Sequence, residues 1–88
     1  MIEVKKFEAE WCGPCRMLKP TFTKLEQKFN EGVKFTYINV DENQELASQY
    51  GVRGIPMVVF EKDGKEVQRF TGVQSEMAYT NAINEWKK

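Results

Sequence analysis

Trp11-Cys12-Gly13-Pro14-Cys15 decides how this sequence is interpreted, because it holds the only two cysteines of the chain and opens its longest helical pattern. Cysteines separated by two residues lie close together on the first turn of a helix, near enough to form a reversible disulfide. Cys12 falls at the helix start, where unpaired N–H groups and the helix dipole stabilise a thiolate. Pro14 costs no hydrogen bond in a first turn and stiffens the loop between the sulfurs. The stretch therefore predicts a redox-active cysteine pair.

Three other interpretations of the pair are less favoured. Structural zinc usually takes four Cys or His ligands, and this chain has two cysteines and no histidine, so zinc would need a dimer and no metal site is expected. A static disulfide between residues so close in sequence removes little entropy from the unfolded chain and so stabilises little. Two inert buried thiols are the third interpretation. The Trp and Gly-Pro residues around the pair favour redox chemistry over all three.

The length and composition predict one domain over residues 1–88, large enough for a hydrophobic core. Thirteen basic and thirteen acidic residues give a net charge of zero, so no overall field favours binding to nucleic acid or to an anionic membrane. No segment resembles a signal peptide or a membrane span. By default we expect a monomer in a cytoplasmic, reducing setting, which suits a catalytic cysteine pair.

Hydrophobic spacing predicts a strand at residues 2–9 and a helix at 13–30. The helix has apolar side chains at spacings of three and four, which indicates one buried stripe. The stripe consists of Cys15, Leu18, Phe22, Leu25 and Phe29. Cys15 therefore faces inward, and Cys12 is expected to be the sulfur that meets solvent and substrate. Pro20 should kink this helix by removing one hydrogen bond, and Gly32 marks its end.

A second strand is predicted at residues 33–40, which are rich in β-branched and aromatic side chains. A short helix follows, with Asn43 as its expected N-cap and Gly51 at its end. Met57-Val58-Val59-Phe60 is a continuous apolar run, typical of a strand covered on both faces.

Asp63-Gly64 signals a hairpin that leads into a last strand at residues 65–71. Strict alternation along this strand places Val67 and Arg69 on one face, and Gln68 and Phe70 on the other. Gly72 then ends the strand, and Ser75 is expected to cap a final helix. The apolar stripe of that helix is formed by Tyr79, Ala82, Ile83 and Trp86.

This order of elements predicts an α/β fold with the pattern β-α-β-α-β-β-α. Connections between parallel strands are right-handed, which nearly settles the topology. We expect a four-stranded mixed sheet with a parallel βαβ half, an antiparallel hairpin half and helices on both faces.

The sequence resembles the thioredoxin family over nearly its whole length. The matching segments are Ala9–Cys15, Pro20, Asn39-Val40-Asp41, Tyr50–Pro56 and Gly72. The resemblance implies the thioredoxin fold and a protein-disulfide reductase in which Cys12 attacks a substrate disulfide and Cys15 resolves the mixed disulfide. It also implies protein disulfides as substrates, a thioredoxin reductase or equivalent as electron donor, and no bound cofactor.

The resemblance further implies roles for residues beside the pair. Pro56 is expected to adopt a cis peptide, and Gly13 and Pro14 to support the cysteines. The surface that holds the target backbone would include Trp11, Ile55, Gly72 and Val73. For Trp11, target contact and simple packing are equally compatible with its place at a loop tip before the cysteine.

The chain departs from the family pattern in ways that concern proton transfer. Lys6 stands where thioredoxins commonly have a buried aspartate, Tyr37 replaces the usual lysine partner of that aspartate, and Glu8 stands where a tryptophan is common. Lys6 and Glu8 therefore either support catalysis or form a solvated pair on a partly uncovered strand. The resemblance begins after the usual first strand and helix of longer thioredoxins, so we expect a layout as compact as that of glutaredoxins.

A second function is compatible with the same fold. Thioredoxin-like chains also serve as binding subunits that support a larger enzyme without using their cysteines. The intact cysteine pair, with Ile55-Pro56 expected beside it, favours the reductase over this alternative.

Overall fold

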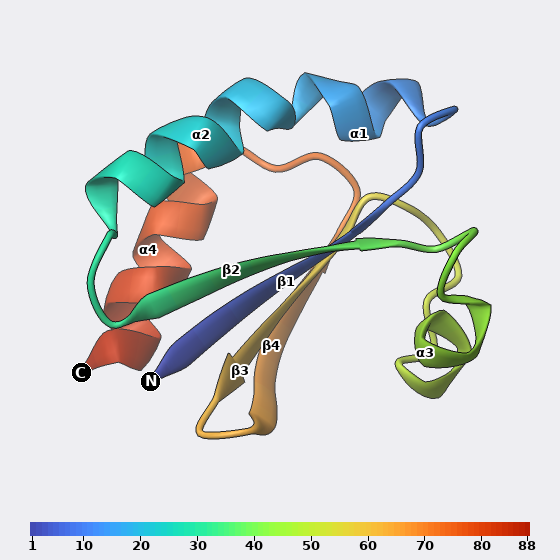
Figure 1. The fold of residues 1–88 in the computed structure, drawn as a ribbon. Coiled ribbons are helices and arrows are strands. Elements are labelled where there is room, and N and C mark those ends of the chain that lie inside the picture. Colours follow the sequence, from blue (N-terminus) through green and yellow to red (C-terminus); the bar gives the residue numbers. More distant parts are fainter.

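The computed structural model describes residues 1–88 and alternates strands with helices in the predicted order (Figure 1). The strands are β1 (Ile2–Glu8), β2 (Val33–Asn39), β3 (Met57–Lys62) and β4 (Lys65–Thr71). The helices are α1 (Gly13–Met17), α2 (Lys19–Lys28), α3 (Gln44–Gln49) and α4 (Glu76–Lys87). None of these helices is long and apolar enough to cross a membrane.

The strands form one mixed sheet in the order β2-β1-β3-β4. Strand β1 runs parallel to β2 and antiparallel to β3, and β3 pairs antiparallel with β4. The turn between β3 and β4 has positive φ at both Asp63 (52°) and Gly64 (85°), the backbone geometry that favours a two-residue hairpin. The predicted mixed sheet with its parallel and antiparallel halves is confirmed.

Helices cover both faces of the sheet, as predicted (Figure 1). Helices α2 and α4 pack on one face, over a core formed by Ile2, Val4, Leu18, Phe22, Leu25, Phe29, Val58, Phe60, Tyr79, Ala82 and Ile83. Helix α3 packs on the other face, over a smaller core formed by Phe7, Ile38, Ala47, Met57 and Val59. The central strand β3 is buried on both faces, because it contributes side chains to both cores.

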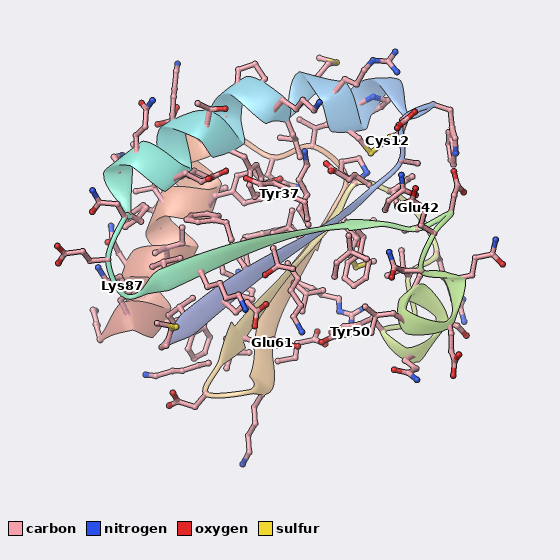
Figure 2. The ribbon with its side chains drawn as sticks, viewed as in Figure 1. Cys12, Tyr37, Glu42, Tyr50, Glu61 and Lys87 are labelled. Atoms are coloured by element: carbon pink, nitrogen blue, oxygen red, sulfur yellow. A yellow bond between two sulfur atoms is a disulfide. The ribbon has the colours of Figure 1, made fainter.

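A group of polar side chains anchors the end of α3 to the sheet. The Lys5 ammonium donates to the Tyr50 hydroxyl at 2.6 Å and lies 3.0 Å from a carboxylate oxygen of Glu61. The Tyr50 hydroxyl donates to Glu61 at 2.5 Å (Figure 2). Since Tyr50 caps α3, these contacts fix the point from which the chain returns toward β3.

The predicted long helix is divided into two at Leu18. Pro20 has no N–H to give to the carbonyl of Arg16, so the hydrogen-bond ladder breaks and α2 begins anew with Pro20 in its first turn. All five side chains of the predicted stripe are nevertheless buried. The kink is thus stronger than expected, while the buried face is confirmed.

The prediction that side chains alternate strictly between the two faces along β4 was wrong. The pairing shifts register so that Phe60 faces Gln68 and Glu61 faces Glu66, which leaves Val67 as an extra residue in a β-bulge. The bulge lets Val67 and Phe70 pack against the same core.

The two predicted helix caps have different outcomes. The Ser75 hydroxyl accepts from the N–H of Ala78 at 3.1 Å, so this cap is confirmed. Asn43 occupies the N-cap position of α3, but its side-chain N–H donates to the carbonyl of Asn39 instead.

Candidate active site

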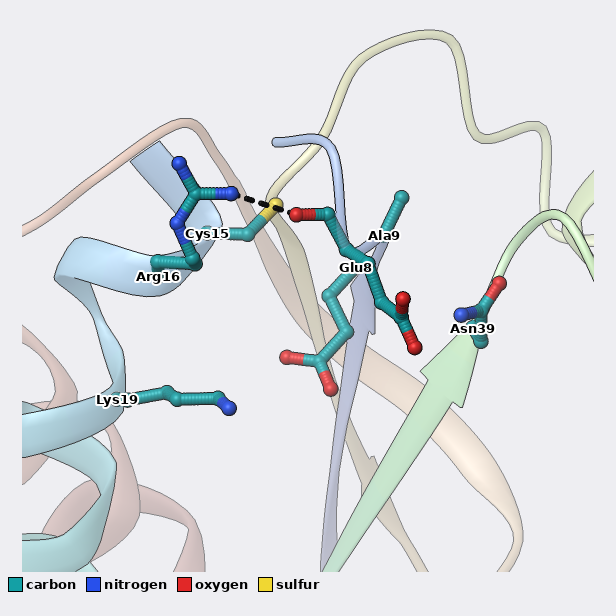
Figure 3. Close-up of a pocket in the computed structure, with 7 residues that line it drawn as sticks. Glu8, Ala9, Cys15, Arg16, Lys19 and Asn39 are labelled. Atoms are coloured by element: carbon teal, nitrogen blue, oxygen red, sulfur yellow. Dashed lines mark hydrogen bonds between the residues drawn. The ribbon is translucent and has the colours of Figure 1, made fainter. Parts of the chain in front are cut away.

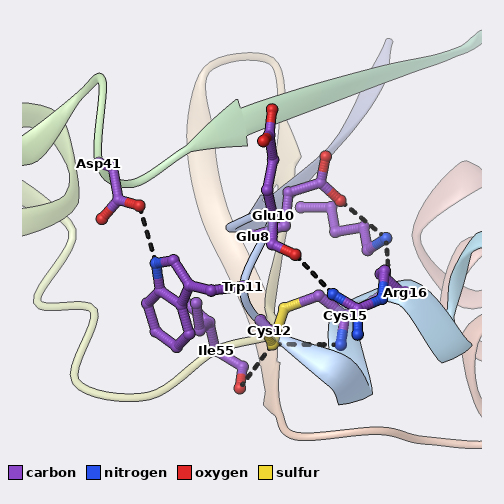
Figure 4. Close-up of a disulfide and its surroundings, with 9 residues drawn as sticks. Glu8, Glu10, Trp11, Cys12, Cys15, Arg16, Asp41 and Ile55 are labelled. Atoms are coloured by element: carbon purple, nitrogen blue, oxygen red, sulfur yellow. Dashed lines mark hydrogen bonds and ion pairs between the residues drawn. A yellow bond between two sulfur atoms is a disulfide. The ribbon is translucent and has the colours of Figure 1, made fainter.

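The cysteine pair lies at the start of α1, directly after the chain leaves β1 (Figure 4). Cys12 is the N-cap of the helix, and a disulfide joins it to Cys15, with 5.3 Å between the two Cα atoms. Pro14 sits in the first turn, as predicted. The backbone N–H of Cys15 donates to the Cys12 sulfur at 3.2 Å. An N–H donor at a helix start stabilises negative charge, so the Cys12 sulfur occupies a site that favours a thiolate in the reduced chain.

Both cysteines are covered while the disulfide is closed, Cys12 being 4 % exposed and Cys15 2 %. The expected inward orientation of Cys15 is confirmed. Cys12 was expected to be the more exposed of the two sulfurs, but with the disulfide closed it is as buried as Cys15. The disulfide directs the Cys12 sulfur toward Cys15, and the carbonyl oxygen of Ile55 lies 3.8 Å from that sulfur. Ala9 packs with the two cysteines, and Val40 and Ile55 flank them.

The Ile55–Pro56 peptide is cis, as the resemblance implies. The carbonyl oxygen of Pro56 accepts from the N–H of Gly72 at 2.8 Å, which joins the start of β3 to the end of β4. Val73 follows Gly72 and is exposed. Ile55 and Gly72 are thereby brought to the same end of the sheet as the cysteines.

Trp11 is 67 % exposed, so it is not a core residue. Its indole N–H donates to the carboxylate of Asp41 at 2.8 Å, which fixes the ring at the loop tip (Figure 4). Beside it is an apolar groove of about 330 Å³, lined by Trp11, Val40, Ala47, Val52, Arg53, Gly54 and Ile55. The contact with Asp41 was not predicted, and neither were the groove residues other than Trp11 and Ile55, because no local pattern links the second strand to the first loop.

Lys6 is fully buried behind the cysteine pair, so the interpretation as a solvated pair was wrong for this residue. Its ammonium lies 2.8 Å from a carboxylate oxygen of Glu8 and donates to the carbonyl of Cys15 at 3.2 Å. The rings of Phe22 and Tyr37 lie 5.2 and 5.7 Å from the ammonium. The strand alternation that buries Val4 also points Lys6 and Glu8 toward α1 and α2.

Tyr37 lies directly opposite Lys6 in the register of β1 and β2. Its hydroxyl donates to the carboxylate of Glu26. Burial, the hydrogen bond and charge of Glu26, and the charge of Glu8 raise the pKa of Tyr37, so the phenol stays neutral. The pairing with Glu26 was not predicted, since the two residues come from a strand and a helix whose relative position the sequence pattern leaves open.

A hollow of about 270 Å³ opens beside the buried cysteine (Figure 3). Its walls are formed by Glu8, Ala9, Glu10, Cys15, Arg16, Lys19 and Asn39. Arg16 donates to the backbone carbonyl of Glu10 at 2.6 Å. The hollow gives one face of Cys15 an opening to polar and charged groups.

The arrangement can carry out reversible two-electron chemistry, because the two cysteines are close enough to form a disulfide that thiol exchange can open. No group of three or more His, Cys, Asp or Glu side chains gathers in the way that a metal site needs. The Thioredoxin family model matches residues 2–85. This chain belongs to the thioredoxin family. Its Cys12–Cys15 pair therefore makes it a dithiol–disulfide oxidoreductase.

Relatives and solved structures agree with this assignment. The chain is 41% identical over 78 residues to thioredoxin from Bacillus subtilis, and the match covers 89% of this chain and 75% of that protein. It is 40% identical over 78 residues to thioredoxin 1 from Synechococcus elongatus, and the match covers 89% of this chain and 73% of that protein. A mutant thioredoxin from Halobacterium salinarum superposes with a TM-score of 0.92 at 40% identity, covering 99% of this chain and 75% of that one. Thioredoxin from Fasciola hepatica gives a TM-score of 0.89 at 41% identity, covering 97% and 80%.

Proposed function

We propose that residues 1–88 form one thioredoxin-like domain that reduces disulfides of other proteins, with Cys12 as the attacking cysteine and Cys15 as the resolving one. The observation that carries these roles is the hydrogen bond from the Cys15 N–H to the Cys12 sulfur at the start of α1. The same contact would stabilise a Cys12 thiolate, whereas Cys15 lies one turn inside the helix with its carbonyl on the Lys6 ammonium.

The reaction has two sulfur exchanges. The Cys12 thiolate attacks one sulfur of the target disulfide, which forms a mixed disulfide and releases the first target thiolate. The Cys15 thiolate then attacks the Cys12 sulfur, so the Cys12–Cys15 disulfide forms, the mixed disulfide breaks and the second target thiolate leaves. Two electrons pass to the target, and the chain is left oxidised.

The target would lie across the end of the sheet beside the cysteines. Trp11 and Ile55 line the apolar groove there, and Gly72 and Val73 continue the surface next to the cis Pro56. The Ile55 carbonyl, 3.8 Å from the Cys12 sulfur, is available to a backbone N–H of the target. Gly13 and Pro14 would support the pair by holding its turn.

The family implies protein disulfides as substrates and a reductase as the source of electrons. We take a thioredoxin reductase or an equivalent donor as that partner, and a monomer in a reducing, cytoplasmic compartment as the working form. A cysteine pair that must be re-reduced after each turnover suits such a compartment.

Reduction of insulin in the presence of dithiothreitol tests this function. The chain should accelerate precipitation of the insulin B chain, and Cys12→Ser should lose that acceleration. Ser48→Ala, on the exposed side of α3, is the matched control and should keep it. Activity retained in Cys12→Ser would contradict the proposal. If partner proteins stay bound to the chain when reductant is added and when both cysteines are replaced, the binding-subunit function would be favoured instead.

A further inference from the structure

A fully buried ammonium needs partners, because an unpaired charge inside a protein is costly. The Lys6 ammonium has two polar partners, the Glu8 carboxylate at 2.8 Å and the Cys15 carbonyl at 3.2 Å. One cation thus connects the end of β1 to the turn that carries the resolving sulfur. The two sulfur exchanges themselves use neither Lys6 nor Glu8.

The Glu8 side chain is 24% exposed, because it reaches from the buried ammonium into the hollow beside Cys15. Glu8 and Cys15 are walls of the same hollow, whose volume is about 270 Å³ (Figure 3). A water molecule takes up about 30 Å³ in the liquid, so the hollow has room for water between the carboxylate and the cysteine.

The resolving step requires a proton acceptor. Cys15 is 2 % exposed and packs with Ala9, Val40 and Ile55, and apolar surroundings favour the thiol over the thiolate. Only the thiolate attacks a disulfide. The hollow, whose walls carry charged and polar side chains, gives the Cys15 proton a way out.

We propose that Glu8 accepts the proton of Cys15 through one water in this hollow, and that Lys6 is the positioning residue that holds the Glu8 carboxylate there. The step rests on the proposed function, since it concerns the second sulfur exchange. The Cys15 S–H proton passes to the water as the water gives a proton to the Glu8 carboxylate. The resulting thiolate attacks the Cys12 sulfur, and the departing target thiolate or solvent later takes the proton from Glu8.

The other charged groups around the hollow fit this assignment. Arg16 and Lys19 contribute positive charge to its walls, which favours a thiolate at Cys15. Glu10 contributes a second carboxylate, but no buried cation holds it, and Arg16 contacts its backbone rather than its side chain. Behind Lys6, the Glu26 carboxylate is occupied by the Tyr37 hydroxyl. Glu8 is thus the acid tethered to the cysteine turn.

Rapid mixing of the reduced chain with an aromatic disulfide, both halves of which leave as coloured thiolates, separates the two exchanges. The first coloured thiolate reports attack by Cys12, at a rate that depends on reagent concentration. The second reports resolution by Cys15, at a rate that does not. Glu8→Gln should slow the second phase at pH 7 by roughly 100-fold, the lower end of the roughly 10²–10⁴-fold that a positioned base contributes.

The first phase of Glu8→Gln should stay within about twofold of wild type. The deficit in the second phase should shrink as pH rises, because hydroxide then removes the proton directly. Glu10→Gln, the acid in the same hollow without the buried partner, is the matched control and should leave both phases unchanged. Lys6→Met should lower the ratio of the second rate to the first, because the carboxylate is no longer held.

Equal second-phase rates in wild type and Glu8→Gln would overturn the proposal, as would equal slowing by Glu8→Gln and Glu10→Gln. An unchanged ratio in Lys6→Met would remove the positioning role. If Glu8→Gln fails to fold, Glu8→Asp is the substitute, because it keeps an acid at the site but draws the carboxylate back from Lys6 by one methylene. A second phase as fast in Glu8→Asp as in wild type would then overturn the proposal. Release of only one coloured thiolate by wild type would instead contradict the proposed function itself.

Discussion

The ammonium of Lys6 lies 3.2 Å from the carbonyl oxygen of Cys15, so a fully buried cation touches the backbone of the redox-active turn. The Glu8 carboxylate, 2.8 Å from the same ammonium, balances its charge. The pair is therefore neutral as a whole, but either half alone would place a net charge next to the cysteines.

Removing either half of this pair should shift the reduction potential of the cysteine couple in opposite directions. Glu8→Gln leaves the cation, which stabilises thiolates and so makes the couple more oxidising. Lys6→Met leaves the anion, which destabilises thiolates and makes the couple more reducing. Redox titration against a glutathione buffer should show shifts on the order of 30 mV, a tenfold change in the equilibrium constant.

The double variant Lys6→Met/Glu8→Gln serves as the control for these shifts, since it removes both charges and should return the potential close to that of wild type. Shifts of the same sign in the two single variants would mean that the pair acts by altering the fold and not by its charge.

Alkylation of the reduced chain should begin at Cys12. The Cys12 sulfur lies at the helix start and receives the N–H of Cys15, so it should carry more thiolate at neutral pH than the sulfur one turn further in. Peptide mapping after brief exposure to iodoacetamide measures the order directly. Labelling of Cys15 first would reverse the roles assigned to the two cysteines.

The chain should lose stability above about pH 10, and Tyr50→Phe should reduce part of that loss. Burial and the hydrogen bond to Glu61 raise the pKa of Tyr50. Burial alone would lower the pKa of Lys5, but its contacts with Tyr50 and Glu61 outweigh this and raise the pKa. Both groups therefore hold protons in the folded chain that the unfolded chain releases, so the stability they contribute at neutral pH falls as pH rises.

At pH 7 the same substitution should lower the free energy of unfolding by about 1 kcal/mol, because Lys5 and Glu61 lose the hydroxyl that lies between them. Urea denaturation of both proteins at pH 7 and at pH 11 measures the two effects. An identical loss of stability at high pH in wild type and Tyr50→Phe would contradict the role of this hydroxyl.

Gly72→Ala should destabilise the fold by about 1–2 kcal/mol, because Gly72 has φ +82° and an L-residue is strained there. No atom outside its neighbours lies within 4 Å of the added methyl group, so the cost is one of backbone conformation and not of packing. Gly13→Ala is the matched control, since its surroundings are equally open and its φ is not positive. Thermal melting should separate the two variants; equal melting temperatures would contradict this account.

Much of the fold could be predicted from local patterns in the sequence. Periodicity or turn chemistry within a few residues is enough to predict three features. These are the apolar stripe from Cys15 to Phe29, the burial of β3 on both faces, and the hairpin at Asp63-Gly64. The bulge at Val67 could not be predicted in this way. It depends on how β3 and β4 pair, and strict alternation along one strand contains no information about its partner.

The site was predictable where it is contiguous in sequence and less so where it is assembled from several elements. Cys12, Cys15 and Pro14 lie within one turn, and their arrangement follows from helix geometry. The burial of Lys6 depends on the packing of α2 over β1, and composition alone favours exposure for a lysine. The partners of Tyr37 and Trp11, which are Glu26 and Asp41, come from other elements and required the assembled fold.

Trapping of the mixed disulfide tests most directly the claim that Cys12 forms the bond to the target. Reduced Cys15→Ser, mixed with a peptide that contains one disulfide, should accumulate a covalent adduct, because the resolving sulfur is gone. Mass spectrometry of its fragments should place the peptide on Cys12, and dithiothreitol should release it. Absence of an adduct in the folded variant, or an adduct that reductant does not release, would contradict the account.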